Sequence, residues 1–347
     1  MSVQMMSDIA PDDARGADLF LYGRTRDPRG LHLLSSVGLT APRRLEIRQT
    51  EGGVSDADKA SDASDFDIGV DQLATALTKW IETHPGIPHI VIDISCMSRP
   101  TMASAFQAML EASESKSVRL DVLYVLAEYT PPPAQLPPNE DIRPINDWFA
   151  GWPTNATAST SLVVGLGYER DKASGACEYF DASENWVFVP QSAISDYQTA
   201  VEHNNDVLLA RARRRELATT YRVERPTETF GLLASTVSRI LPRANPVLLP
   251  FGPKVFFALN LLVASIYREA GVWHVTGDSE LPDVPHAPSS ITPAFRVELG
   301  PSVSPIASDT GSTSAVPDRR KRERQADPSR DGGADLPSAN STTSSAG

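Results

Sequence analysis

The sequence predicts an α/β protein built from two halves, each a parallel sheet with helices on both faces. Two observations lead to this prediction. Short apolar runs typical of buried strands alternate with longer runs in which apolar residues recur at helical spacing. A proline-rich stretch, TPPPAQLPPNEDIRP (130–144), divides this alternation in two, because proline stiffens the chain and cannot donate a sheet hydrogen bond. Strands separated by helices pair in parallel through right-handed connections, so each half is expected to be Rossmann-like.

The first half is assigned to residues 15–130. Strands are predicted at 17–23, 43–49, 89–95 and 120–129, of which HIVIDIS (89–95) is the most clearly buried. The segment 70–83 places Leu73, Leu77 and Ile81 on one face of a helix. A second helix is predicted from Pro100 to about residue 112. The acidic, serine-rich stretch 51–65 is expected to be a surface loop.

The second half, residues 161–298, repeats the pattern. Strands are predicted at 161–169, 185–190, 220–226, 246–252 and 272–278, and helices at 172–180, 195–215, 227–241 and 253–271. Residues 1–14 are expected to be a flexible N-terminus, and residues 131–160 a linker between the halves. Residues 299–347 are rich in Ser, Thr, Pro and Gly and hold hardly any aliphatic side chain, so this tail is expected to be disordered.

Charge and composition argue against several classes of partner. The chain has 347 residues, a formal net charge of -12 and a pI near 5.0, which opposes long-range attraction to nucleic acid or an anionic membrane. The exception is a basic cluster in the tail, either a solvated linker or a nucleic-acid or partner contact, formed by Arg319, Arg320, Lys321, Arg322 and Arg324. The N-terminus lacks the pattern of a signal peptide, and no segment approaches the roughly 18 consecutive apolar residues of a membrane span. We therefore expect a cytoplasmic protein without a membrane partner.

Residue types that hold metals or cofactors are not grouped in this sequence. The six histidines are dispersed, and Cys96 and Cys177 lack the spacing of a metal or redox site. The nucleophile motif GxSxG and the phosphate-binding loop GxxxxGK(S/T) are both absent. No metal and no cofactor are predicted, and chemistry is expected at the strand ends, where open α/β sheets bind their ligands.

Residues 91–100, VIDISCMSRP, form the most informative strand end. The strand stops at Asp93, and Ser95 and Arg99 follow before Pro100 begins a helix. A helix N-terminus directs unpaired N–H groups and partial positive charge at this point, and Arg99 adds a full charge. We therefore predict anion recognition, with Ser95 bonding a phosphate or ribose and Asp93 orienting Arg99 or accepting from a sugar hydroxyl. The alternative is that Asp93 and Ser95 merely cap turns.

A second strand end, PFGPKVFF (250–257), repeats the order of strand, small residue, proline, base and apolar helix. Gly252 permits close approach of the backbone. Lys254 lies in the first helical turn, where a cation is unfavourable and an anionic partner is therefore plausible. The alternative for Lys254 is a side chain that extends to solvent.

A third strand end, VVGLGYER (163–170), begins like a dinucleotide-binding fingerprint. Arg170 occupies the position of the third glycine, so the match is incomplete. Gly165, Gly167 and Glu169 are predicted to approach a ligand at the sheet edge, the alternative being an ordinary tight turn.

The loop after the first strand, LFLYGRTRDPRG (19–30), is the fourth candidate. Tyr22 could stack on a base and Arg24 could contact a phosphate, with Gly23 between them. The alternative is an exposed basic loop.

The spacing D-x-S-x-x-x-R at Asp93, Ser95 and Arg99 resembles the strand-end signature of the CARF family, the CRISPR-associated Rossmann-fold domains that sense cyclic oligonucleotides. The resemblance covers residues 15–130, and the loop at 22–24 matches a ligand-contacting loop of that family in position. The second half lacks the signature and resembles the second unit of the related SAVED domains. The resemblance implies a regulatory protein of prokaryotic antiviral defence, with a homodimer and a separate effector protein as expected partners, since no effector domain is recognisable.

Three functions stay open at this point. The first is a non-catalytic sensor that binds a cyclic oligonucleotide or another phosphorylated nucleotide across the strand ends. The second is an enzyme acting on such a ligand, a ring nuclease or a nucleotide glycosidase, in which Arg99, Lys254 or Glu169 stabilises charge or moves a proton. The third is an adaptor that binds no ligand of this kind.

Overall fold

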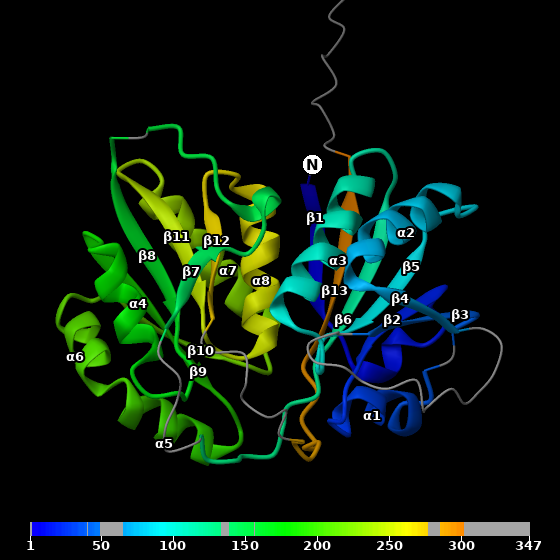
Figure 1. Cartoon of the computed structure of the whole chain (residues 1–347), viewed down its shortest axis with the longest axis horizontal. Coiled ribbons are helices and arrows are strands. Elements are labelled where there is room, and N and C mark those ends of the chain that lie inside the picture. Colours follow the sequence, from blue (N-terminus) through cyan, green and yellow to red (C-terminus); the bar gives the residue numbers. More distant parts are fainter. Residues whose placement is uncertain are drawn as a thin grey trace, which may run out of the picture. The chain divides into compact units, whose positions relative to one another are not determined.

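Two sheets flanked by helices form the framework of the computed structural model (Figure 1). The α/β class with two Rossmann-like halves is confirmed. The structure describes residues 2–39, 41–48, 65–132, 139–155, 157–276 and 285–301. The predicted surface loop up to residue 64, the predicted disordered tail from residue 302 onward and the basic cluster within it lie outside the described residues.

The first sheet has seven strands in the order β1-β13-β6-β5-β2-β3-β4. Neighbours from β6 to β4 pair in parallel, whereas β13 is antiparallel to both β6 and β1. The strands are β1 (Ser2–Asp8), β2 (Leu19–Arg24), β3 (Arg43–Arg48), β4 (Asp65–Gly69), β5 (His89–Asp93), β6 (Val118–Leu123) and β13 (Ala294–Gly300).

The second sheet has six strands in the order β10-β9-β8-β11-β12-β7. All neighbours pair in parallel except β7, which is antiparallel to β12. The strands are β7 (Asp141–Pro144), β8 (Ser159–Gly165), β9 (Glu184–Gln191), β10 (Ala218–Arg222), β11 (Ala244–Pro250) and β12 (Gly271–Thr276).

The parallel strands of the two sheets share one topology. In each sheet their spatial order is third, second, first, fourth and fifth along the chain, as in β4-β3-β2-β5-β6 and β10-β9-β8-β11-β12. Strand β5 with the helix after it therefore corresponds to β11 with the helix after it. The strand order reverses beside β5 and beside β11, which are the switch points where such sheets bind ligands.

Helices cover both faces of each sheet. On the first sheet, α1 packs on one face and α2 and α3 pack on the other. On the second sheet, α4, α5 and α6 pack on one face and α7 and α8 on the other. The helices are α1 (Arg29–Ser36), α2 (Val70–Thr83), α3 (Arg99–Ala112), α4 (Lys172–Phe180), α5 (Ser195–Asn204), α6 (Asp206–Arg214), α7 (Pro226–Ile240) and α8 (Lys254–Ile266). None of the helices in the described ranges is long and apolar enough to cross a membrane.

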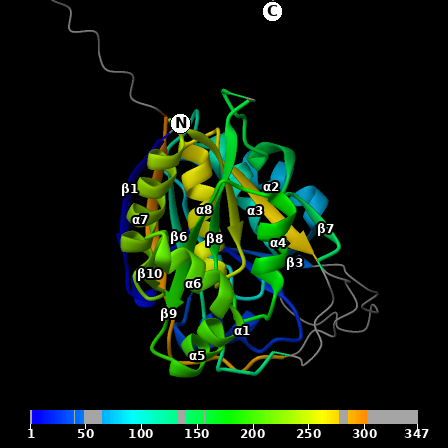
Figure 2. The same ribbon diagram turned by 90° about the vertical axis from the view of Figure 1, so that its left-hand side faces the viewer.

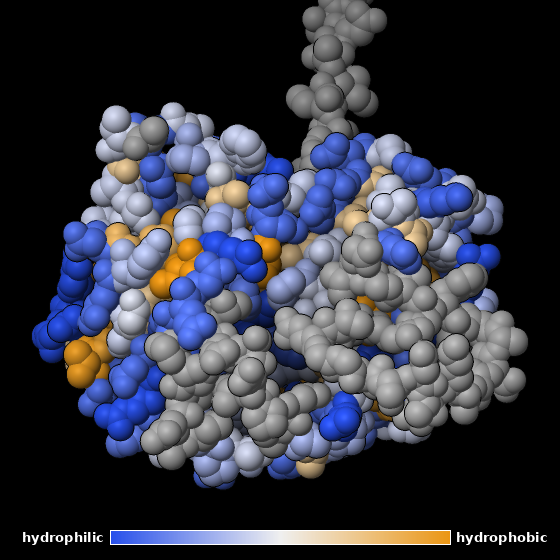
Figure 3. All heavy atoms as spheres, in the orientation of Figure 1, coloured by the Kyte–Doolittle hydropathy of each residue, from blue (hydrophilic) through white to orange (hydrophobic). Residues whose placement is uncertain are grey.

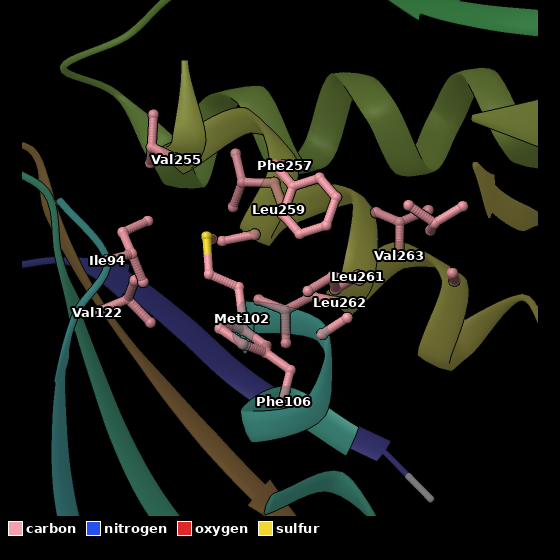
Figure 4. Packing of buried hydrophobic residues seen from close by; sticks show 14 of the residues in the cluster. Ile94, Met102, Phe106, Val122, Val255, Phe257, Leu259, Leu261, Leu262 and Val263 are labelled. Carbon is pink, nitrogen blue, oxygen red and sulfur yellow. The ribbon is translucent and has the colours of Figure 1, made fainter. Parts of the chain in front are cut away.

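One hydrophobic core joins the two halves through α3 and α8. Met102 and Phe106 of α3 point toward Phe257 and Leu261 of α8, and all four side chains are fully buried (Figure 4). The turned view places α7 beside β1 (Figure 2). Burial of this apolar surface holds the carboxyl ends of β5 and β11 at one junction.

The three antiparallel strands are among the segments that differ from the sequence prediction, as are helix α1 and strand β4, which were not predicted, and the predicted helix 195–215, which is the two helices α5 and α6. Residues Ser2–Asp8, within the predicted flexible N-terminus, form edge strand β1. Asp141–Pro144, within the predicted linker, form edge strand β7. Ala294–Gly300, assigned to the second half and the start of the tail, pair with β6 in the first sheet. Edge strands are stabilised by their partner strand as much as by their own pattern, so a short one carries little local signal.

Candidate functional site

A cavity of about 190 Å³ lies where the carboxyl ends of parallel strands from both sheets meet. Its walls come from the ends of β6, β8, β9 and β11, the first residues of α1, α3 and α8, and one face of α5. The side chains and backbone that define it include Arg29, Arg99, Tyr124, Gly167, Tyr168, Glu169, Ser192, Tyr197, Phe251, Gly252, Lys254 and His286. It is therefore a site at the switch points of both halves.

The acid and hydroxyl of the first strand end turn away from this cavity. Asp93 is 1% exposed, and its Oδ1 accepts from the backbone N–H of Ser95 at 2.9 Å and from the Ser95 hydroxyl. The Ser95 hydroxyl in turn accepts from the N–H of Val125 at 2.8 Å, which ties the end of β5 to the end of β6. Burial raises the pKa of Asp93 to about 6, although the bonds from Ser95 oppose the rise. Asp93 and Ser95 thus brace the loop that carries Arg99.

Arg99 begins α3 and lines the cavity. Its Nη2 donates to the carbonyl oxygens of Phe251 and Gly252, at 3.2 and 3.1 Å, on the opposite half. Its guanidinium carbon lies 5.8 Å from the ring centre of Phe257, a cation–π contact. Within the described residues its Nε has no hydrogen-bond partner. Burial lowers the pKa of Arg99 from its ordinary value.

Lys254 makes the corresponding contact in the other direction. It begins α8, and its Nζ donates to the carbonyl oxygen of Ser95 at 2.8 Å. Burial lowers its pKa to about 8, and the positive charges of Arg29 and Arg99 act in the same direction. Arg99 and Lys254 occupy equivalent places in the two halves, and each bonds to backbone of the other half. We call this pair of contacts the cation clamp.

A third cation, Arg29, was missed at the level of the sequence. It begins α1, is 8% exposed, and pairs with Asp27 through Nη2–Oδ2 and Nε–Oδ1 contacts of 2.7 and 3.0 Å. Burial disfavours both charges, but the bonds between them outweigh it, so the pKa of Arg29 is raised and that of Asp27 is lowered. Arg29 is therefore a fixed positive charge at the cavity wall. The local signal was the D-x-R spacing in a loop that precedes a helix.

Aromatic rings form another part of the wall. Tyr197 packs edge-on against Tyr129 and Tyr168, with ring centres 5.2 and 5.4 Å apart. Its hydroxyl lies 3.2 Å from the carbonyl oxygens of Ala127 and Glu128 and donates to them, which links α5 to the loop after β6. Tyr124, Tyr168 and Tyr197 line the cavity. No sequence motif identifies these tyrosines as a group, because they come from three separate parts of the chain.

The glycine turn after β8 is needed for close packing. A Cβ on Gly167 would lie 2.9 Å from the carbonyl oxygen of Phe251, and one on Gly252 would lie 2.8 Å from that of Leu166. These two turns therefore touch through their backbones and form the floor of the cavity. Glu169 follows in the same loop, and burial raises its pKa, opposed by the charges of Arg99 and Lys172.

The last residues of β2, Tyr22, Gly23 and Arg24, lie outside the cavity lining. Tyr22 is 3% exposed and its hydroxyl donates to Glu46 at 2.9 Å, while Arg24 forms an exposed pair with the same carboxylate at 3.3 Å. Gly23 packs against α1, since its carbonyl oxygen lies 3.0 Å from the place of a Cβ on Gly30. The structure thus brings five of the predicted site residues to the cavity, namely Arg99, Gly167, Glu169, Gly252 and Lys254.

Gly165 has a packing environment that can be tested. A Cβ on Gly165 would lie 2.3 Å from Cε1 of Phe256, which is fully buried. We expect Gly165→Ala to lower the free energy of unfolding by about 1–3 kcal/mol, because an added methyl forces the ring aside. Gly231→Ala is the matched control, since no atom lies within 4 Å of its Cβ and an exposed helical glycine gains up to about 1 kcal/mol on this change. Equal midpoints for both variants in urea would contradict the prediction.

The sequence matches no protein-family model, and no curated protein is significantly similar to it. The residues that the structure describes bring no three His, Cys, Asp or Glu side chains into the arrangement of a metal site. Fold and cavity define the class: an α/β protein of two Rossmann-like halves with a cationic, tyrosine-lined cavity between their strand ends.

Proposed function

We propose that this protein is a sensor that binds a nucleotide-type ligand, such as a cyclic oligonucleotide, in the cavity between the two halves. The observation that carries the proposal is the set of three cations, Arg29, Arg99 and Lys254, on the wall of one cavity at two switch points. Arg99 and Lys254 are held by carbonyl oxygens rather than by carboxylates within hydrogen-bond distance. A neutral carbonyl does not neutralise a cation, and the cations of the lining outnumber its one carboxylate, Glu169, so the cavity favours an anion.

Phosphate is the anion that suits these groups best. Arg99 offers guanidinium donors and an unpaired Nε, and Lys254 offers an ammonium whose pKa is lowered to about 8 because it is buried near other cations. A phosphate beside Lys254 would stabilise the charged form and raise that pKa again. Charge-assisted bonds of this kind are about twice as strong as bonds between neutral groups.

The tyrosines support a ligand that also carries a base. Tyr168 and Tyr197 present ring surface to the cavity that holds the cations. Stacking of a base on an aromatic ring contributes about 1–3 kcal/mol and tolerates any base. A nucleotide therefore fits better than inorganic phosphate alone, because it uses both parts of the wall.

The cation clamp suggests how binding becomes a signal. Each clamp cation bonds to the opposite half, so a phosphate that draws Arg99 or Lys254 toward itself must weaken or replace a bond across the junction. The ligand then has different affinities for the clamped and released states, which is the condition for shifting their equilibrium. A role in prokaryotic antiviral defence, a cytoplasmic location, a homodimer and a separate effector partner belong to the proposal through the D-x-S-x-x-x-R resemblance.

Binding is tested with Lys254→Met, which keeps the aliphatic stem and removes the charge. Calorimetric titration with cyclic oligoadenylates, cyclic dinucleotides, ATP and NAD identifies the ligand for the native protein. We expect Lys254→Met to weaken its affinity about 10- to 100-fold, the effect of losing one hydrogen bond to a charged group.

Lys79→Met is the matched control, since Lys79 is an exposed lysine of α2 that does not line the cavity. It should bind like the native protein. If no member of the panel binds, the sensor proposal fails and an adaptor that binds no nucleotide becomes the better reading. Binding that is equally strong in native protein and Lys254→Met would place the ligand elsewhere.

A second function is an enzyme that cleaves the same ligand. The observation in its favour is that Glu169 and Lys254 line one cavity with pKa values moved toward neutrality by burial. Groups of this kind serve as general acid and base. Chromatography of the ligand after incubation with the protein separates the two functions: product that accumulates with time and disappears in Glu169→Gln supports the enzyme, and unchanged ligand supports the sensor.

A further inference from the structure

A second hollow, of about 300 Å³, lies beside the C-terminal end of α6, on the side of the second sheet that α4, α5 and α6 cover. Its polar walls are Arg211, Arg214, Arg215 and Asn185, and its floor is apolar, with Leu208 and Leu217. Figure 3 shows strongly hydrophilic side chains over the region that α6 occupies in Figure 1. No acidic residue is part of the lining.

The arginines of the run ARARRRE divide into two groups. Arg213 turns to Glu202 and forms an ion pair of 3.1 Å outside the hollow. Arg215 donates only to the carbonyl oxygen of Ser183, at 3.4 Å. Arg211 and Arg214 have no ion pair or hydrogen bond from their side chains within the described residues. The three that face the hollow are thus the three without a carboxylate partner.

The helix end by itself does not account for this arrangement. A helix C-terminus carries about half a negative charge and favours a cation in its last turn. Three guanidinium groups around one hollow exceed that charge several-fold, and like charges raise the energy of the empty site. An anion in the hollow would remove this repulsion, and the planar guanidinium binds phosphate oxygens in pairs.

Asn185 adds a second, independent observation. It stands near the start of β9, and its Oδ1 is buried with no hydrogen-bond partner in the part of the chain that the structure describes. A buried acceptor without a donor is destabilising. A ligand hydroxyl would satisfy this acceptor once the amide side chain turns toward the hollow that Asn185 lines, while the arginines hold the phosphate.

We propose that this hollow, which we call the α6 site, binds a small phosphate monoester that carries hydroxyl groups, such as a sugar phosphate. The phosphate contacts Arg211, Arg214 and Arg215, and a hydroxyl donates to Asn185. The site is separate from the cavity between the two halves, since the two share no lining residue. A small ligand fits better than nucleic acid because the net charge of -12 opposes a long polyanion, whereas a concave site of this size encloses one phosphate.

The probe is ribose 5-phosphate, titrated calorimetrically at constant ionic strength and compared with ribose and with inorganic phosphate. We expect saturable binding of ribose 5-phosphate that falls at least tenfold in Arg214→Ala and is unchanged in Arg213→Ala. Arg213 is the matched control, since it lies on the same helix and faces away from the hollow. Asn185→Ala should weaken ribose 5-phosphate but leave inorganic phosphate unchanged.

Four results would overturn the α6 site. The first two are an equal loss of affinity in Arg213→Ala and Arg214→Ala, and a heat signal with potassium chloride as large as that with ribose 5-phosphate. The other two are no binding of ribose 5-phosphate to the native protein, and binding of an RNA oligonucleotide but of no phosphate monoester. Arg213 and Arg214 are exposed, so their alanine variants should keep the native unfolding midpoint, which shows that a loss of binding is not a loss of fold. The test uses no ligand of the cavity between the halves, so its outcome is independent of the proposed function.

Discussion

Replacing Asp121 by Ala is expected to lower the free energy of unfolding by about 3–5 kcal/mol, the effect of removing one partner of a buried ion pair. Asp121 on β6 is fully buried. It accepts from Nε and Nη2 of Arg296 on β13, at 2.6 and 2.7 Å, and lies 2.7 Å from Nε2 of His89 on β5. The variant would leave Arg296 without its ion-pair partner at the point where β13 joins the parallel strands. Urea unfolding followed by circular dichroism measures the loss.

A second ion pair between the same two strands gives the control. Arg119 and Glu298 pair at 2.9 Å, but the Arg119 side chain is 46% exposed. Glu298→Ala should therefore cost no more than about 1 kcal/mol, the range of surface pairs. If the two variants lose equal stability, burial of Asp121 is not the cause of its contribution.

Lowering the pH should remove the contribution of Asp121 to the stability of the fold. Burial would raise its pKa, but the hydrogen bonds from Arg296 and His89 outweigh burial and lower it. The unfolded chain then binds a proton more readily than the folded one, so this stability is present above the unfolded pKa of about 3.9 and is lost as pH falls through the folded pKa. The stability difference between native protein and Asp121→Ala should accordingly narrow below pH 4. A difference that stays constant down to pH 2 would contradict this linkage.

The second large effect is expected at Phe256, where substitution by Ala should cost about 3–5 kcal/mol. The ring is fully buried in α8, stacks on Tyr221 with centres 4.7 Å apart, and lies 5.5 Å from the ring of Phe188. It also fills the space that Gly165 leaves by lacking a Cβ. Its loss therefore opens a cavity between α8 and the second sheet, and the urea midpoint should fall at unchanged slope.

Two further variants test whether lost packing of the Phe256 ring causes this loss of stability. Leu232→Ala, on an exposed face of α7, should change stability by no more than about 0.5 kcal/mol. In the Phe256→Ala background, Gly165→Ala should lose less stability than it does in the native protein, since the methyl then enters an empty space. Strictly additive losses would mean that contact of the added methyl with the Phe256 ring is not the cause of the stability lost in Gly165→Ala.

The local sequence pattern was sufficient to predict a strand or helix whose own residues are mostly apolar and buried. β5 and α8 were predicted because their apolar residues form continuous runs, which both-sided burial demands. α2 was predicted because its apolar residues share one helical face. β1, β7 and β13 were not predicted, since each joins its sheet antiparallel and draws its stability from a strand distant in the sequence. Such pairing leaves no trace within a short window.

The candidate site divides in the same way. Arg99, Glu169 and Lys254 were singled out because they follow apolar strands, and the structure places all three at one cavity. Asp93 and Ser95 stand at the same strand end but turn inward, where they bond each other and Val125. Position at a strand end predicts the neighbourhood of a side chain; its direction depends on the hydrogen bonds that the loop can make.

The sequence by itself determined that this chain folds as two similar α/β halves and that its candidate site residues follow strand ends, because periodicity and turn chemistry are local properties. Only the tertiary structure decided that the ends of β5 and β11 face each other, so that Arg99 and Lys254 reach across to the opposite half. That arrangement follows from the packing of α3 on α8, between residues more than a hundred positions apart. Contacts of such separation depend on complementary shape, which no motif in either helix records.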